Sequence, residues 1–256
     1  MTELEYAKRG LVGVLTPQAN TTVEPEFTVL WPAGIAMLNA RLTSPKKTIE
    51  ERLVDYMAQA EDSLDQFANA PIQAVAFACT GTSYLIGREK EAEVCDRIEQ
   101  KRGYPFVTAA RAVTDSFAAL DAEKIGLVSP YPSSLTEVSV EYWKSTGLDV
   151  AEVASAFNDD SDFHPIYSLK ADSSFDALNS LENRGLDAIV MLGTGMPTLK
   201  PILDVANWNG PPVTSCMLSL AWRTVMFIDG TAPTADNMLD WSRGKDWRKR
   251  MQVHYI

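Results

Sequence analysis

The stretch AVAFACTGTS, residues 74–83, is an apolar run that ends at a cysteine and continues into threonine, glycine and serine. A short apolar run bounded by turn residues is typical of a buried strand, and small polar residues after it suit the first turn of a helix. Cys79 is therefore expected where a strand gives way to a helix. A cysteine at such a point is either a small buried residue or a nucleophile at the carboxyl end of the strand. This stretch by itself does not decide between the two.

The chain repeats this stretch. Three segments of the first part recur in the same order later in the chain at nearly one offset, which predicts two similar halves. Each match alone is weak, because strand ends often look alike. The pairs are VGVLTP at 12–17 with IGLVSP at 125–130 (offset 113), AVAFACTG at 74–81 with AIVMLGTG at 188–195 (offset 114), and PFVTAARAV at 105–113 with PPVTSCMLS at 211–219 (offset 106).

Short apolar or β-branched runs alternate with longer amphipathic segments along the whole chain. This alternation predicts an α/β fold with parallel sheets covered on both faces. We expect one domain-like half from residues 1–119 plus 225–256 and a second from 120–224, with the C-terminal segment packing back on the first half. The expected strands are Leu11–Thr16, Ile35–Arg41, Ala74–Cys79, Phe106–Thr108, Ile125–Ser129, Val150–Ala156, Ala188–Leu192 and Val213–Thr214, and the expected helices are 48–68, 87–100, 110–120, 134–145, 173–183 and 217–227.

Composition excludes several classes of function. The formal net charge of −11 argues against nucleic acid or an anionic membrane surface as partner. Three cysteines do not suggest a disulfide framework, no apolar run approaches a membrane span, and the N-terminus lacks a secretory segment, so we expect a cytoplasmic protein. No zinc-ligand spacing and no nucleotide-binding glycine motif occurs, so we expect neither metal nor cofactor. Catalysis would then rest on thiol, hydroxyls and backbone amides.

The carboxyl ends of parallel strands bind ligands in α/β folds, and candidate residues gather there. At Cys79 the free N–H groups and positive end of the following helix favour thiolate over thiol. Cys95 is expected inside a helix and is interpreted as structural, whereas Cys216, near a helix start, is left with either role. Asn20 and its threonine neighbours either cap a helix or line an anion pocket. Tyr131, between two prolines, is either a packed aromatic or a hydroxyl donor.

Four of these segments together resemble the aspartate/glutamate racemase superfamily, nearest to its maleate cis–trans isomerase and arylmalonate decarboxylase branches. They are GVLTPQANTTVEPEF at 13–27, ACTGTS at 78–83, LVSPYP at 127–132 and MLGTGMPTL at 191–199. The resemblance implies two Rossmann-like (flavodoxin-like) halves with pseudo-twofold symmetry, an active-site cleft between them, no cofactor, and a homo-oligomer. It also implies one cysteine on each half, and Cys79 matches the first. At the second position the chain has Gly193.

The glycine at position 193, in place of a second cysteine, distinguishes between the activities that the resemblance implies. Racemases need an acid and a base on opposite faces of a carbon, and here the second thiol is missing. Maleate isomerases use the first-half cysteine to add to a double bond. Arylmalonate decarboxylases carry one cysteine on the second half, so Cys79 as proton donor would give the opposite enantiomer.

We therefore predict a cofactor-independent, cysteine-dependent enzyme acting on a small carboxylic or dicarboxylic acid, with cis–trans isomerisation favoured. Decarboxylation with Cys79 as proton donor is the alternative, followed by a racemase-like enzyme or a non-catalytic small-acid binding protein. Arg41 and Arg52 are either carboxylate clamps or solvated or structural arginines. By resemblance, the residues around the substrate are Cys79, Thr80, Gly81 and Tyr131 at the oxyanion, Asn20 at a carboxylate, Gly193 and Thr194 on the far wall, and Asn158 or the acids beside it.

Overall fold

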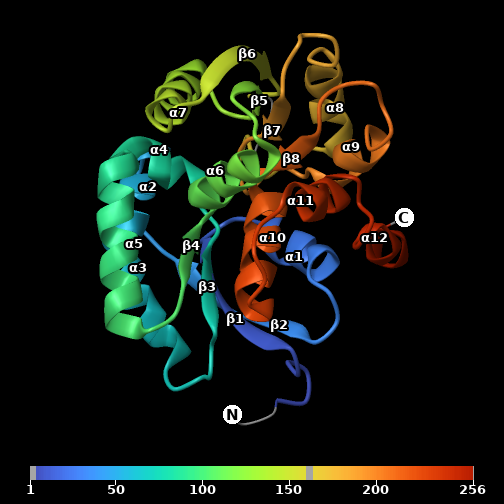
Figure 1. Ribbon diagram of the computed structural model, residues 1–256. Coiled ribbons are helices and arrows are strands. Elements are labelled where there is room, and N and C mark those ends of the chain that lie inside the picture. Colours follow the sequence, from blue (N-terminus) through green and yellow to red (C-terminus); the bar gives the residue numbers. More distant parts are fainter. Residues whose placement is uncertain (1–3, 160–163, 256) are drawn as a thin grey trace.

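The structure is a computed structural model that describes residues 4–159 and 164–255. Within these residues it contains two four-stranded parallel sheets, ordered β2-β1-β3-β4 and β6-β5-β7-β8, with helices around both (Figure 1). The predicted α/β class and all eight predicted strands are confirmed, with ends shifted by at most two residues. The strands are β1 (Gly10–Pro17), β2 (Ile35–Leu42), β3 (Ala74–Phe77), β4 (Phe106–Thr108), β5 (Lys124–Ser129), β6 (Asp149–Ser155), β7 (Ala188–Met191) and β8 (Val213–Ser215).

The two sheets have the same topology, as the internal repeat predicts. The alignment of its third pair, 105–113 with 211–219, was wrong by one residue. Val75 of β3 pairs with Phe106 of β4, and Ile189 of β7 pairs with Val213 of β8. Because Val75 and Ile189 are equivalent, the offset there is 107 rather than 106. The residues that then correspond are Thr108 and Ser215, whose side chains accept hydrogen bonds from the backbone three residues on and cap the following helices.

The exposure of the strands depends both on their place in the sheets and on what covers them. The inner strands β3 and β7 are apolar and buried throughout, as expected for strands covered on both faces. The strands β2 and β6 lie at sheet edges and carry polar residues such as Asn39 and Glu152, with two residues of β2 and none of β6 buried. These two edges are therefore partly open to water, whereas the opposite edge strands β4 and β8 are buried throughout.

Six helices were predicted, and one of them is broken in the structure. The segment 48–68 forms α2, α3 and a short 3₁₀ turn instead of one helix. It begins at the predicted position, where Thr48 forms a capping box that was not predicted. At Phe67 the ring packs so closely on β1 that a Cβ on Gly13 would lie 2.7 Å from its Cε2 atom. The apolar spacing marks the buried face correctly, but packing on the sheet bends the chain. The helices are α1 (Val23–Leu30), α2 (Ile49–Ala58), α3 (Ala60–Ser63), η1 (Leu64–Phe67), α4 (Thr80–Ile86), α5 (Arg88–Arg102), α6 (Ala109–Leu120), α7 (Ser133–Ser145), α8 (Ala171–Asn179), α9 (Leu199–Asp204), α10 (Cys216–Asp229), α11 (Ala235–Ser242) and α12 (Arg248–Tyr255).

Helices α6 and α10, which follow the last strand of each sheet, pack against each other where the halves meet (Figure 1). Arg223 of α10 donates a 2.5 Å hydrogen bond to Asp115 of α6. Helix α10 also contacts α1 and β3 of the first half. The last helix of the second half therefore packs against the first half. The predicted boundary at residue 225 falls inside this helix, and the division into halves stays a prediction. No helix in the described part of the chain is long and apolar enough to cross a membrane.

Candidate active site

A cavity lies where the carboxyl ends of the two sheets face each other, and it contains most of the residues predicted for the site. Its volume is about 50 Å³, which is room for a few water-sized groups. Strand-end residues of both halves line it because the two sheets present the same edge to the junction between them. The predicted residues found in the lining are Cys79, Thr80, Gly81, Tyr131, Gly193 and Thr194.

Cys79 caps the N-terminus of α4 directly after the buried strand β3 and is 3% exposed. Its Sγ atom lies 3.1 Å from the hydroxyl of Thr82, and that hydroxyl also lies 3.0 Å from the carbonyl oxygen of Leu53. A threonine hydroxyl has one proton to donate. Thr82 can therefore donate to Leu53 while Cys79 is a thiol and turn to the sulfur when Cys79 is a thiolate.

The protonation of Cys79 differs from the sequence prediction. Burial raises the pKa of the Cys79 thiol to about 11, although the hydroxyl and backbone N–H of Thr82 act to lower it. The helix terminus was expected to favour the thiolate, but desolvation of a buried anion outweighs this effect. At neutral pH, in the absence of a ligand, Cys79 is a thiol.

Opposite Cys79, the wall at Gly193 is shaped by the hydroxyl of Tyr131. Gly193 has φ of +82°, which side chains rarely adopt, and a Cβ there would lie 3.0 Å from the Tyr131 Oη atom and 3.3 Å from Pro130. A cysteine at position 193 would therefore have a strained backbone and would press against the Tyr131 hydroxyl and Pro130. Burial holds the pKa of Tyr131 well above its usual value, so this hydroxyl is a neutral hydrogen-bond donor.

Asn20 performs the capping role that the sequence left open, and it also joins the two halves. Its side-chain oxygen accepts hydrogen bonds from the backbone of Thr22 (2.8 Å) and Val23 (3.2 Å) at the start of α1. Its side-chain nitrogen donates to the carbonyl of Thr194 at 3.1 Å, and the Thr194 hydroxyl donates to Ala78 at 2.7 Å. Asn20 is buried beside the cavity but is not among its lining residues.

Two other predicted residues lie away from the cavity. Asn158 and the neighbouring Asp159 are exposed beyond the end of β6 and do not line the cavity. The other two acids, Asp160 and Asp162, lie outside the described part of the chain. Arg41 is paired with Glu24 and donates to the carbonyls of Pro17 and Asn20. Arg41 therefore anchors the β1–α1 loop, which favours the structural alternative for this residue.

Cys216 lies behind the cavity wall. It is the first residue of α10 and fully buried, and its thiol interacts with the hydroxyl of Thr80 and the backbone N–H of Gly193. Burial raises its pKa to about 11. Because Cys216 is not among the lining residues, Cys79 is the thiol that faces the cavity in the described structure.

The sequence reasoning missed several lining residues. Tyr56 belongs to the apolar face of α2, to which no role in the site was assigned, and the loop that carries His164 and Tyr167 could not be placed without a structure. Arg52, which was left open as a clamp or a solvated arginine, does line the cavity. The lining residues to which the sequence assigned no role in the site are Pro17, Gln18, Ala19, Ile49, Leu53, Tyr56, His164, Ile166, Tyr167 and Gly195. Among the residues described, no group of three potential metal ligands occurs.

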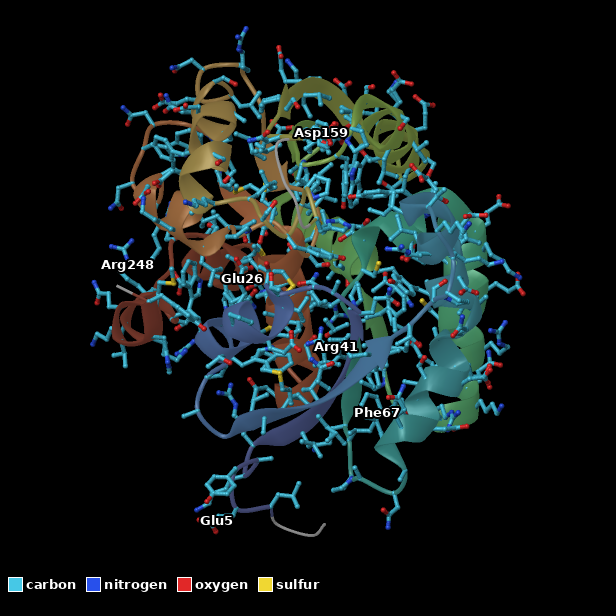
Figure 2. All side chains as sticks on the ribbon, turned by 180° about the vertical axis from the view of Figure 1, so that it is seen from behind. Glu5, Glu26, Arg41, Phe67, Asp159 and Arg248 are labelled. Carbon is cyan, nitrogen blue, oxygen red and sulfur yellow. The ribbon has the colours of Figure 1, made fainter. Side chains whose placement is uncertain are left out.

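A buried carboxylate, Glu26 of α1, ties the far wall of the site to the first half and was also missed. Its carboxylate accepts from the Thr198 backbone N–H at 2.6 Å and from the Thr198 hydroxyl at 3.1 Å. The Thr198 hydroxyl in turn lies 2.9 Å from Ser215, the cap of α10. Figure 2 shows Glu26 in the interior, where the two halves meet. Burial raises the pKa of Glu26 to about 7 in spite of these donors.

We expect Glu26 to make stability depend on pH. A carboxyl whose pKa is raised from 4.5 to about 7 in the folded state stabilises the fold fully below pH 4.5, and this contribution is lost as pH rises to 7. The loss is of the order of 3 kcal/mol. Denaturant unfolding of Glu26→Gln should lack this part of the pH dependence, whereas Glu24→Gln, on the same helix, should keep it. An identical dependence in wild type and Glu26→Gln would contradict the assignment.

The fold and the cavity define an α/β enzyme with two pseudo-symmetric halves and a thiol at their junction. The chain belongs to the arylmalonate decarboxylase family, whose model matches residues 12–238. It is therefore an enzyme of the isomerase or carboxy-lyase type in the aspartate/glutamate racemase superfamily, which confirms the predicted class and resemblance.

Individual relatives agree with this assignment. The maleate isomerase of Geobacillus stearothermophilus is 25% identical over 247 residues, which is 87% of this chain and 93% of that protein. A variant of the maleate isomerase Iso from Pseudomonas putida, solved with maleate, has a TM-score of 0.78 at 23% identity and covers 86% of this chain and 92% of its own. A mutant of the Nocardia farcinica maleate cis–trans isomerase, with a covalently bound succinylcysteine intermediate, has a TM-score of 0.75 at 23% identity over 86% and 93%.

Proposed function

We propose that this enzyme converts a small cis-unsaturated dicarboxylate, maleate or a close relative, into its trans isomer through addition of Cys79. The observation that carries the proposal is a cavity-facing thiol in a small site whose described lining contains Arg52 but no aspartate or glutamate. A site without carboxylates on a protein of net charge −11 suits an anionic ligand. The names of the curated relatives and the succinylcysteine intermediate of one related enzyme support the same reaction.

The reaction needs no change in oxidation state. The Cys79 thiolate attacks one alkene carbon, and the electron pair of the double bond moves onto the neighbouring carboxylate to form an enediolate. The remaining carbon–carbon single bond rotates. The enediolate then re-forms the double bond in the trans geometry and expels the thiolate, so that no proton is gained or lost overall.

Two hydroxyls are placed to assist these steps. The Tyr131 hydroxyl lines the cavity as a neutral donor and would stabilise the negative charge that develops on the enediolate oxygens. The Thr82 hydroxyl lies 3.1 Å from Sγ and would stabilise the thiolate before addition and after expulsion. Before the first addition the thiol loses its proton to water, and its raised pKa makes this step unfavourable.

Decarboxylation of an arylmalonate is the second candidate, and the protonation of Cys79 favours it. A thiol whose pKa is about 11 is a proton donor at neutral pH. Loss of carbon dioxide from the malonate would leave an enediolate, which would take its proton from Sγ, and water would then reprotonate the thiolate. Because Cys79 stands on the first-half wall, the product would be the enantiomer opposite to that of a decarboxylase with its cysteine on the second half.

A pH–rate profile separates the two reactions. If Cys79 acts as a thiolate, kcat/KM for maleate should rise about tenfold per pH unit between pH 7 and 9, because the thiolate fraction rises by this factor below a pKa of about 11. If Cys79 acts as a proton donor, the profile for a 2-aryl-2-methylmalonate should be flat over the same range. Proton NMR of each substrate measures both reactions directly.

The outcomes are distinct. Formation of fumarate with the rising profile supports isomerisation, and formation of a chiral 2-arylpropionate with the flat profile supports decarboxylation. Turnover of neither substrate by folded protein would remove both candidates.

A further inference from the structure

The cavity carries a guanidinium and an imidazole that the chemistry at Cys79 does not use. Arg52 on α2 and His164 on the β6–α8 connection both line it. Arg52 is the one formally charged residue among the described lining residues, and nothing in the steps above requires a positive charge there.

Arg52 is held in place by backbone carbonyls rather than by an acidic partner. Its Nε atom donates to the Lys46 carbonyl at 2.7 Å, and its Nη2 atom donates to the Lys47 carbonyl at 3.2 Å. Across residues 4–159 and 164–255 no carboxylate lies within ion-pair distance of Arg52. Arg41, in contrast, is paired with Glu24. A guanidinium fixed on one side, with N–H groups left over and no counter-ion, is suited to bind a carboxylate.

His164 is arranged to add a neutral hydrogen bond. The backbone N–H of Ile166 donates to its Nδ1 atom at 3.3 Å, which assigns the proton to Nε2. The ring stacks on Tyr167, with 4.0 Å between ring centroids and 17° between planes. Burial and the charge of Arg52 lower the pKa of His164. The imidazole is therefore a neutral Nε2–H donor at pH 7 on a rigidly stacked ring.

The charge of Arg52 affects the pKa of other groups that line the cavity. It lowers the pKa not only of His164 but also of the Tyr56 and Tyr167 hydroxyls, which burial raises. All four residues line the cavity. Arg52 thus stabilises negative charge at this side of the site.

We infer that Arg52 and His164 bind the second carboxylate of the substrate, while the first lies at Tyr131 and Thr80, so that the site selects dicarboxylates over monocarboxylates. This inference rests on the proposed function, since it assumes that the acid bound beside Cys79 is the substrate. It assigns substrate selection to Arg52 of the first half and to His164 of the β6–α8 connection. Asn158, which was expected to bind substrate, lies earlier in the same connection and does not line the cavity.

Binding of unreactive acids tests the inference independently of turnover. Succinate and butyrate have the same carbon chain and differ in one carboxylate, and ligand-observed NMR titration at constant ionic strength measures both. Wild type should bind succinate at least tenfold more tightly than butyrate. Arg52→Gln should weaken succinate binding by about 10- to 100-fold, the range expected for hydrogen bonds to a charged group, and leave butyrate unchanged.

Matched variants exclude indirect effects. Arg97→Gln removes the same charge from a surface ion pair with Glu61 on α3 and should change neither affinity. His164→Phe keeps a ring for stacking on Tyr167 but removes the donor, and should weaken succinate binding about three- to tenfold. Arg52→Lys keeps the charge but loses the paired N–H groups of the guanidinium, and should give an intermediate succinate affinity. It serves as the test variant if Arg52→Gln does not fold.

The results separate this inference from the proposed function. Equal weakening of succinate and butyrate by Arg52→Gln, or no change in either, would overturn the inference even if maleate is isomerised. Suppose instead that Arg52→Gln loses succinate binding selectively but wild type does not convert maleate. This result would support the dicarboxylate site and count against isomerisation.

Discussion

Cys79→Ser is expected to lower the rate of maleate isomerisation by at least about 10³-fold, as the loss of a covalent nucleophile does in other enzymes. A serine hydroxyl is of similar size and can keep the contact to Thr82, but it is a far weaker nucleophile than a thiolate. The loss should appear in kcat, since the substituted atom makes its bond after the substrate is bound. Proton NMR of the conversion of maleate to fumarate measures it.

Cys95 provides the control. Cys95 is buried in α5 beside Arg111 and away from the cavity, so Cys95→Ala should retain the activity of wild type in folded protein. Iodoacetamide should label Cys79 faster than Cys95 as pH rises, and substrate should slow this labelling. Full activity of Cys79→Ser would exclude thiol addition and proton donation alike.

Tyr131→Phe is expected to lower kcat by about 10²- to 10³-fold, the usual effect of removing one donor to a developing oxyanion. The Tyr131 hydroxyl lines the cavity and stays protonated, because burial holds its pKa well above the usual value. The ring contact with Tyr84 should survive, with centroids 6.1 Å apart in an edge-on arrangement. KM should change much less than kcat, because the donor acts mainly on charge that appears during the reaction.

A second tyrosine serves as the reference for this effect. Tyr104 is half-buried and outside the cavity, and Tyr104→Phe should leave kcat unchanged. A proportional rise in KM with unaltered kcat in Tyr131→Phe would assign Tyr131 to substrate binding instead of stabilisation of the enediolate.

Much of the fold could be predicted because it is encoded locally. The runs at 74–79 and 188–192 are long enough for a strand and too short for a helix, and the repeat places equivalent strands in equivalent sheets. The third pair of the repeat was misaligned by one residue because its likeness is confined to a few letters, and the pairing of β4 and β8 with their neighbours decides the true register. The break in 48–68 was missed because the apolar spacing of Tyr56, Ala60 and Leu64 continues across the ends of α2 and α3.

The candidate site was predicted in part. Cys79, Thr80, Gly81, Tyr131, Gly193 and Thr194 stand at strand ends, and the end of a parallel strand can be recognised from sequence. Arg52, Tyr56 and His164 come from a helix face and a long connection, whose side chains reach the cavity only after the halves have met. Glu26 lies on a short helix next to other charged residues, and its burial depends on the loop at Thr198, 172 residues further on.

The sequence by itself determined the α/β class, the two similar halves, and the presence of one thiol at a strand end facing a glycine at its counterpart. These are properties of short segments and of their repetition. The tertiary structure decided that Cys79 is a thiol at neutral pH, that the Tyr131 hydroxyl lies close to Gly193, and that an arginine lines the cavity without an acidic partner among the residues described. Protonation, close approach and charge pairing depend on what surrounds a side chain, and those surroundings arise only when distant parts of the chain come together.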